Sequence, residues 1–108
     1  MPKVKSRTRK RNKVDWEVFA DEIFYKVSRA LDRWCWEVSG DSPLECYSAY
    51  MNRSLYDLAQ EFSGWSYSGI TDKDLELLSK MPDEVYRKYD MKLRSTVESV
   101  VDRLSKGI

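Results

Sequence analysis

Seven lysines and arginines lie within the first 13 residues of the chain, and this segment contains no acidic residue. They are spaced one or two positions apart, which suits an extended chain that follows the phosphates of a nucleic acid. Such contacts give affinity without reading base sequence, and the lack of aromatic residues argues against base stacking by this segment. The residues expected to contact phosphates are Lys3, Lys5, Arg7, Arg9, Lys10, Arg11 and Lys13.

Other functions would also explain a basic arm at residues 1–13. A run of this kind can be a nuclear-import signal in a eukaryotic cell, a binding segment for an anionic protein or a solubilising tail. Nucleic acid is the leading interpretation, and the sequence does not choose between DNA and RNA.

The rest of the chain has the opposite charge. The whole sequence has 19 basic and 18 acidic residues, so residues 14–108 carry 12 basic and 18 acidic residues, a net charge of −6. An anionic body is not expected to lie broadly on nucleic acid. The sequence therefore assigns nucleic-acid contacts to the arm and protein contacts to the body.

The composition argues against an enzyme or a metal protein. The chain has no histidine, the commonest general acid–base and metal ligand, and its two cysteines are too few for a four-ligand zinc site. It has no glycine-rich phosphate loop of a nucleotide-binding site and no apolar run that could span a bilayer. The basic start is not followed by the apolar segment that a signal peptide needs. We expect a non-enzymatic protein without cofactor, metal or membrane contact, located in the cytoplasm, or in the nucleus if the host is eukaryotic.

Hydrophobic periodicity predicts an all-α body at residues 14–108. Apolar residues recur at three- and four-residue steps, and capping sequences, prolines and glycines divide this pattern into helices. The result is a small helical bundle of three long helices and one short helix, preceded by a disordered basic arm. The predicted elements are long helices at 15–38, 43–63 and 82–106, a Gly/Ser loop at 63–69 and a short helix at 71–80.

The outward face of the first predicted helix carries Val18, Tyr25 and Trp36, with Arg29 beside them. They lie opposite the apolar face that the core requires. Trp, Tyr and Arg are enriched in interface hot spots, so this face is a candidate protein interface, including one between two copies of the chain. The alternative is that the short helix or the arm covers it within the monomer.

Two further groups of residues are open to two interpretations. Trp65 and Tyr67 lie in the Gly/Ser loop, where they either contact a partner or plug the end of the bundle. Lys26, Arg29 and Arg33 share one flank of the first helix, where they either extend the phosphate contacts of the arm or form an ordinary solvated flank.

The two cysteines, Cys35 and Cys46, are equally far from the break between the first two helices. Measured from Leu44, the direction of Cys46 lies outside the predicted core face of the second helix. A disulfide needs facing Cβ atoms, so we predict two free thiols.

These observations predict a small non-enzymatic protein that binds nucleic acid through its arm and proteins through its body. The alternative is a protein-interaction module, such as an adaptor or a small inhibitor of a larger enzyme. Such a module suits a virus or a mobile element, and its outward helix face would also serve a homodimer.

Overall fold

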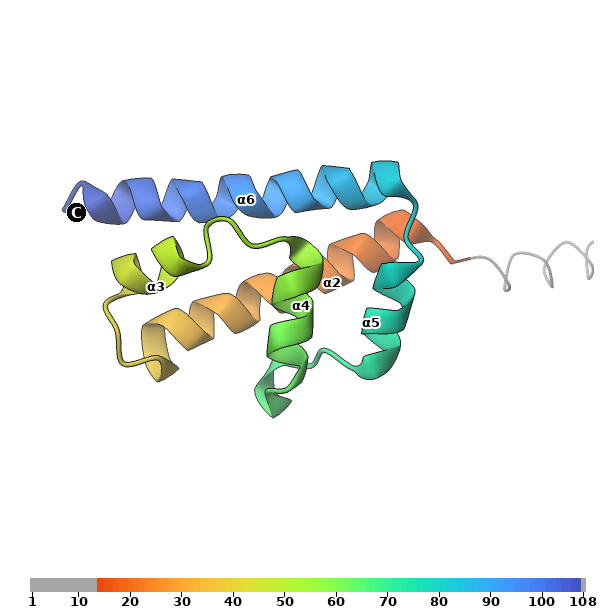
Figure 1. The fold of residues 1–108 in the computed structure, drawn as a ribbon, viewed down its shortest axis with the longest axis horizontal. Helices are drawn as coiled ribbons and strands as arrows, with labels where there is room; N and C mark the ends of the chain where they lie inside the picture. Colours follow the sequence, from red (N-terminus) through yellow and green to blue (C-terminus); the bar gives the residue numbers. More distant parts are fainter. Residues whose placement is uncertain (1–13, 108) are drawn as a thin grey trace, which may run out of the picture.

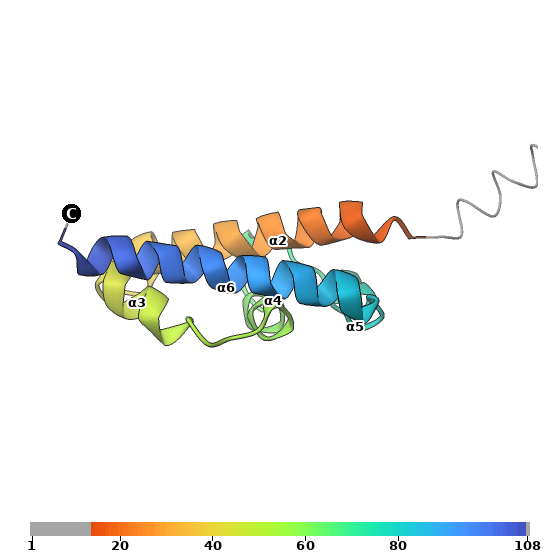
Figure 2. The same ribbon diagram turned by 90° about the horizontal axis from the view of Figure 1, so that it is seen from above.

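The computed structural model describes residues 14–107, which are helical throughout with no strand among them. Two long helices form the frame: α2 (Trp16–Arg33) and α6 (Asp83–Ser105). They lie side by side and run in the same direction, with the shorter helices packed along them (Figures 1 and 2). The all-α prediction is confirmed for these residues, whereas the predicted arm at residues 1–13 lies outside them.

The first predicted helix is present at nearly its full length. Asp15 caps α2 by accepting a hydrogen bond from the backbone N–H of Val18 at 3.2 Å. From residue 34 the helix continues as a π-helical turn, η1 (Trp34–Val38), and ends before Gly40, whose φ of 81° is easily adopted only by glycine. Because π-helical turns often occur at functional sites, η1 makes this end of the first helix a candidate for one.

The prediction of one long helix at residues 43–63 is wrong. This segment forms two helices, α3 (Pro43–Ala49) and α4 (Leu55–Ser63). Ser54 starts α4 afresh by accepting a hydrogen bond from the N–H of Asp57 at 3.1 Å. A second side chain from far along the chain, Asp90 of α6, accepts the N–H of Leu55 at 2.8 Å. With its first-turn donors satisfied in this way, α4 begins in a new direction.

The remaining chain returns from the end of α4 to the start of α6. It passes through a short 3₁₀ turn, η2 (Ser66–Ser68), and α5 (Asp72–Ser79). Thr71 and Asp74 form the capping box that the sequence predicts, with reciprocal hydrogen bonds of 3.0 and 3.1 Å. In place of three long helices and one short one, residues 14–107 therefore contain two long and three short α-helices.

The core lies where α2, α3, α4 and α6 meet. The apolar face of the first helix is buried, but Val38 at its end is exposed; the buried residues of α2 are Phe19, Ala20, Ile23, Val27, Ala30 and Leu31. Each large apolar side chain removed from water contributes about 1.5–3 kcal/mol to folding. The largest fully buried side chains are Tyr47, Ile23, Leu55, Leu58, Leu93 and Val27.

The prediction of two free thiols is wrong. Cys35 and Cys46 form a disulfide, with their Cα atoms 5.4 Å apart, and both residues are buried. The error came from carrying the apolar stripe of α4 back through α3. Because the two helices are separate, the buried face of α3 is centred on Cys46, Tyr47 and Tyr50, while Leu44 is only partly buried. This face is turned by roughly a quarter of a turn from the predicted one.

Candidate functional site

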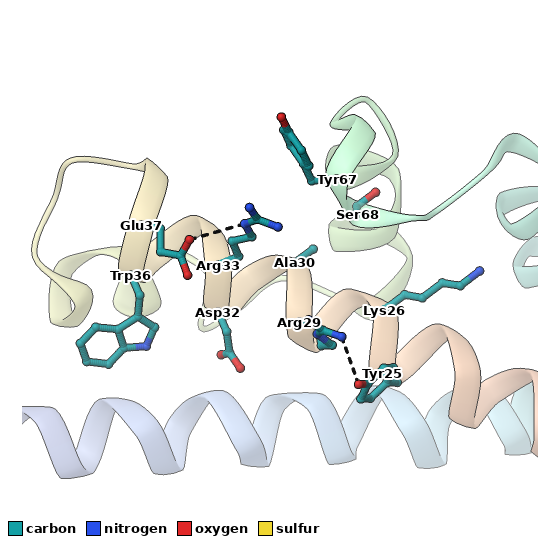
Figure 3. Close-up of a pocket in the computed structure, with 10 residues that line it drawn as sticks. All are labelled: Tyr25, Lys26, Arg29, Ala30, Asp32, Arg33, Trp36, Glu37, Tyr67 and Ser68. Atoms are coloured by element: carbon teal, nitrogen blue, oxygen red, sulfur yellow. Dashed lines mark hydrogen bonds and ion pairs between the residues drawn. The ribbon is translucent and has the colours of Figure 1, made fainter.

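A hollow of about 620 Å³ lies on the outer side of α2, between η1 and the η2 segment (Figure 3). Three aromatic side chains line it, and all are mostly exposed: Tyr25 at 60%, Trp36 at 57% and Tyr67 at 69%. Tyr25 and Trp36 are eleven positions apart on one continuous helix, or about 16 Å along its axis. The structure thus brings together residues that the sequence placed in two separate candidate groups.

Three cations from one flank of α2 line the same hollow. Lys26 forms a 3.0 Å ion pair with Asp74 of α5, and Arg33 forms a 3.5 Å ion pair with Glu37. Arg29 donates a hydrogen bond to the Tyr25 hydroxyl at 3.2 Å. Within residues 14–107, Arg29 forms no ion pair.

The two arginines lie against aromatic rings. The Arg33 guanidinium is 4.9 Å from the centre of the Tyr67 ring. Figure 3 shows the Arg33 side chain extending from the end of α2 toward Tyr67. The Arg29 guanidinium is 5.5 Å from the centre of the Tyr25 ring. These contacts fall within the range of cation–π attraction. They hold flat cationic groups beside flat aromatic groups around the opening.

The carboxylates of the hollow have partners of their own. The buried Tyr47 hydroxyl donates a hydrogen bond to Asp32 and accepts one from the Trp36 indole N–H at 3.1 Å. Burial, and then the hydrogen bond to Asp32, raises the pKa of Tyr47 well above its usual value, so the phenol stays protonated near neutral pH. The network fixes one edge of the Trp36 indole, while most of the side chain stays in solvent.

The disulfide lies directly beside this network. Cys35 precedes Trp36 in η1, and Cys46 precedes Tyr47 in α3. The bond therefore ties together the two segments whose side chains meet at the Trp36–Tyr47 hydrogen bond. No periodicity signal could have revealed Tyr47 as a support of the site, because it is buried and belongs to another helix.

The Lys26 ammonium is partly buried and held by Asp74 rather than freely solvated. Burial acts to raise the pKa of the Asp74 carboxyl, but the Thr71 backbone N–H and the Lys26 ammonium outweigh it and lower the pKa. The ion pair links α2 to α5 at one end of the hollow. Of the three flanking cations, Lys26 is thus the one with the clearest structural role.

The other predicted interface residues lie outside the hollow. Val18 is about half exposed, near the start of α2. Trp65 packs edge-on against Trp34 at 5.8 Å and Tyr67 at 5.6 Å between ring centres, and it is partly buried against the core. Trp65 therefore packs as the plugging interpretation expects and supports Tyr67 from behind. The predicted phosphate contacts of the arm fall on residues that the structure does not describe.

Residues 14–107 contain no group of three side chains suited to hold a metal ion. None of their helices is long and apolar enough to cross a membrane. No protein-family model, no curated protein and no solved structure matches this chain.

Proposed function

We propose that this is a small non-enzymatic nucleic-acid-binding protein whose basic arm holds phosphates and whose folded body adds a second contact at the hollow. The observation that carries the proposal is the meeting of Lys26, Arg29 and Arg33 on a body with a net charge of −6. Three of the body's 12 basic residues line one hollow. Lys26 and Arg33 are paired with Asp74 and Glu37, so Arg29 is the residue of the hollow that we propose to bind a phosphate.

The spacing between arm and hollow supports one ligand contacting both. Arg29 lies 15 positions after residue 14, or about 22 Å along the helix. A 13-residue arm spans at most about 45 Å when fully extended. The arm is therefore long enough to follow a strand that also reaches Arg29.

Deletion of residues 1–13 tests the proposal. The full chain should bind a labelled 30-nucleotide DNA or RNA, measured by fluorescence anisotropy, and the deletion should lose most of that affinity. Neutralising about five to seven phosphates gives a log–log salt slope of about −3.5 to −5 on this single strand, and about −4 to −6 on duplex DNA. Circular dichroism should show the same helical content and thermal midpoint in both proteins. A flat salt dependence, or full binding by the deletion variant, contradicts the proposal.

A protein-interaction module is the second candidate, and the exposed Tyr25, Trp36 and Arg29 favour it because these residue types dominate interface hot spots. An adaptor, a small inhibitor of a larger enzyme and a homodimer all belong to this class, and a viral or mobile-element origin would suit it. Capture from the native host with and without nuclease separates it from the first proposal. A partner that remains after nuclease treatment supports the module, and sedimentation measures self-association.

A further inference from the structure

We infer that the hollow is a base-stacking site, so that the protein prefers single-stranded over duplex nucleic acid. This inference rests on the proposed function and names its substrate class. The sequence indicates phosphate contacts from the arm but no stacking from it, because the arm has no aromatic residue. The structure supplies three exposed rings around the hollow, spread over about 16 Å along α2, a span that suits several nucleotides of one strand.

The rings are available for stacking. Trp36 is held at its indole N–H by Tyr47, and 57% of the residue remains exposed. Tyr25 and Tyr67 are still more exposed, and an arginine guanidinium lies over one face of each ring, so a base would stack on the other face. Unpaired bases present π-faces to such rings whatever their sequence, whereas the bases of a duplex are already stacked on each other.

The charges of the hollow suit a phosphate beside a stacked base. Glu37 is paired with Arg33, and Asp32 accepts the Tyr47 hydroxyl, so both carboxylates at the hollow have donors. Arg29 forms no ion pair within residues 14–107 and lies next to Tyr25. Its guanidinium is therefore placed to bind a backbone phosphate of a nucleotide stacked on the rings.

The lining favours a nucleic acid over a protein partner. Of the ten residues that line the hollow, five are charged and three are aromatic, and Ala30 is the only aliphatic one (Figure 3). The centre of a protein interface is typically depleted of charged residues other than arginine, whereas Lys26, Asp32 and Glu37 also line this hollow. Alternating arginines and aromatic rings are instead what single-strand binding proteins use along a strand. The volume of about 620 Å³ falls within the roughly 300–1,000 Å³ of small-molecule sites, which is enough for a nucleotide.

The test compares a 12-nucleotide oligothymidylate with a 12-base-pair duplex in the full chain, by fluorescence anisotropy at one salt concentration. The wild type should bind the single strand at least tenfold more tightly. The double variant Tyr25→Leu/Tyr67→Leu keeps the charges of the hollow and removes two rings. It should lose at least tenfold in affinity for the single strand, about 1.4 kcal/mol, and little for the duplex. Met91→Leu, at a 62% exposed position of α6 outside the hollow, is the matched control and should bind like the wild type.

The outcomes separate the two proposals. Equal binding of both ligands by the wild type, or an equal loss on both ligands in the double variant, overturns the stacking site while leaving arm-driven binding in place. Binding of neither ligand by the wild type overturns the proposed function as well. Binding of an oligoglutamate peptide that the double variant loses, with no binding of the oligothymidylate, would make the hollow a site for an acidic protein and overturn the inference. Unchanged circular dichroism of the variant shows that its loss of binding is not a loss of folding.

Discussion

Removing the disulfide should lower the stability of the body substantially. The bond between Cys35 and Cys46 spans eleven positions and so closes a loop of 12 residues. In the chain-entropy model a closed loop of this size stabilises the folded state by about 3 kcal/mol. A domain of this size is stable by about 5–15 kcal/mol, so the bond would supply a large part of the total.

The measurement is urea unfolding followed by circular dichroism, with and without reductant, on the wild type and on Cys35→Ser/Cys46→Ser. Reduction should lower the free energy of unfolding of the wild type by about 3 kcal/mol and its thermal midpoint by about 10–20 °C. The double serine variant should match the reduced wild type and show no response to reductant. This control separates the bond from any other effect of the reagent.

Two results would refute the reasoning. One is mass spectrometry that finds two free thiols in protein purified without reductant. The other is a wild type whose stability does not change on reduction although the bond is present at the start. Thiol trapping in the native cell bears on location as well, because cytosolic thiols are normally kept reduced. The cytoplasmic location stays a prediction until that state is known.

Two further predictions concern single side chains. Trp36→Ala should cost only about 1 kcal/mol of folding stability, because the indole is mostly exposed and only one hydrogen bond is lost. The same change should weaken nucleic-acid binding by about 2 kcal/mol. A loss of several kcal/mol in urea unfolding, with unchanged anisotropy titrations, would show that Trp36 is a core residue instead. Burial and the hydrogen bond to Glu61 raise the pKa of Tyr50 from 10.0 to about 12. This tyrosine therefore contributes stability that is fully present below pH 10 and is lost as the pH rises toward 12. In alkaline unfolding, Tyr50→Phe should lose less stability than the wild type between pH 10 and 12, and identical curves would contradict the raised pKa.

The sequence predicts those parts of the fold that local signals determine. Asp15 caps α2, and the capping box of Thr71 and Asp74 starts α5, as the residue types indicate. The break before α4 also has a local signal, Ser54 followed by Asp57, but the apolar stripe runs through it without interruption. The donor at Leu55 is satisfied by Asp90 of α6, a contact that no local pattern can reveal.

The candidate site was predictable by its residues but not by its shape. Tyr25, Arg29, Trp36 and Tyr67 stand out by type and by their positions in the pattern. That they line one hollow depends on the position of Tyr67 in η2, because the other three residues lie on α2 and η1. The position of η2 depends in turn on the direction of α4, which precedes it in the chain. The support of Trp36 by Tyr47 depends on a cysteine pairing that the helical-wheel geometry argued against.

The parallel pairing of α2 with α6 has a consequence for how the chain folds. Every residue from 34 to 82 is synthesised between these two helices, yet they lie side by side in the finished structure (Figure 2). The disulfide loop is local and can close early, whereas Leu93 and Val97 complete the core only after α6 has emerged. During translation the parts of α2 and α3 that pack against α6 therefore stay exposed until that helix has emerged. Closing so long a loop slows folding, and the exposed intermediate is the state from which aggregation would begin.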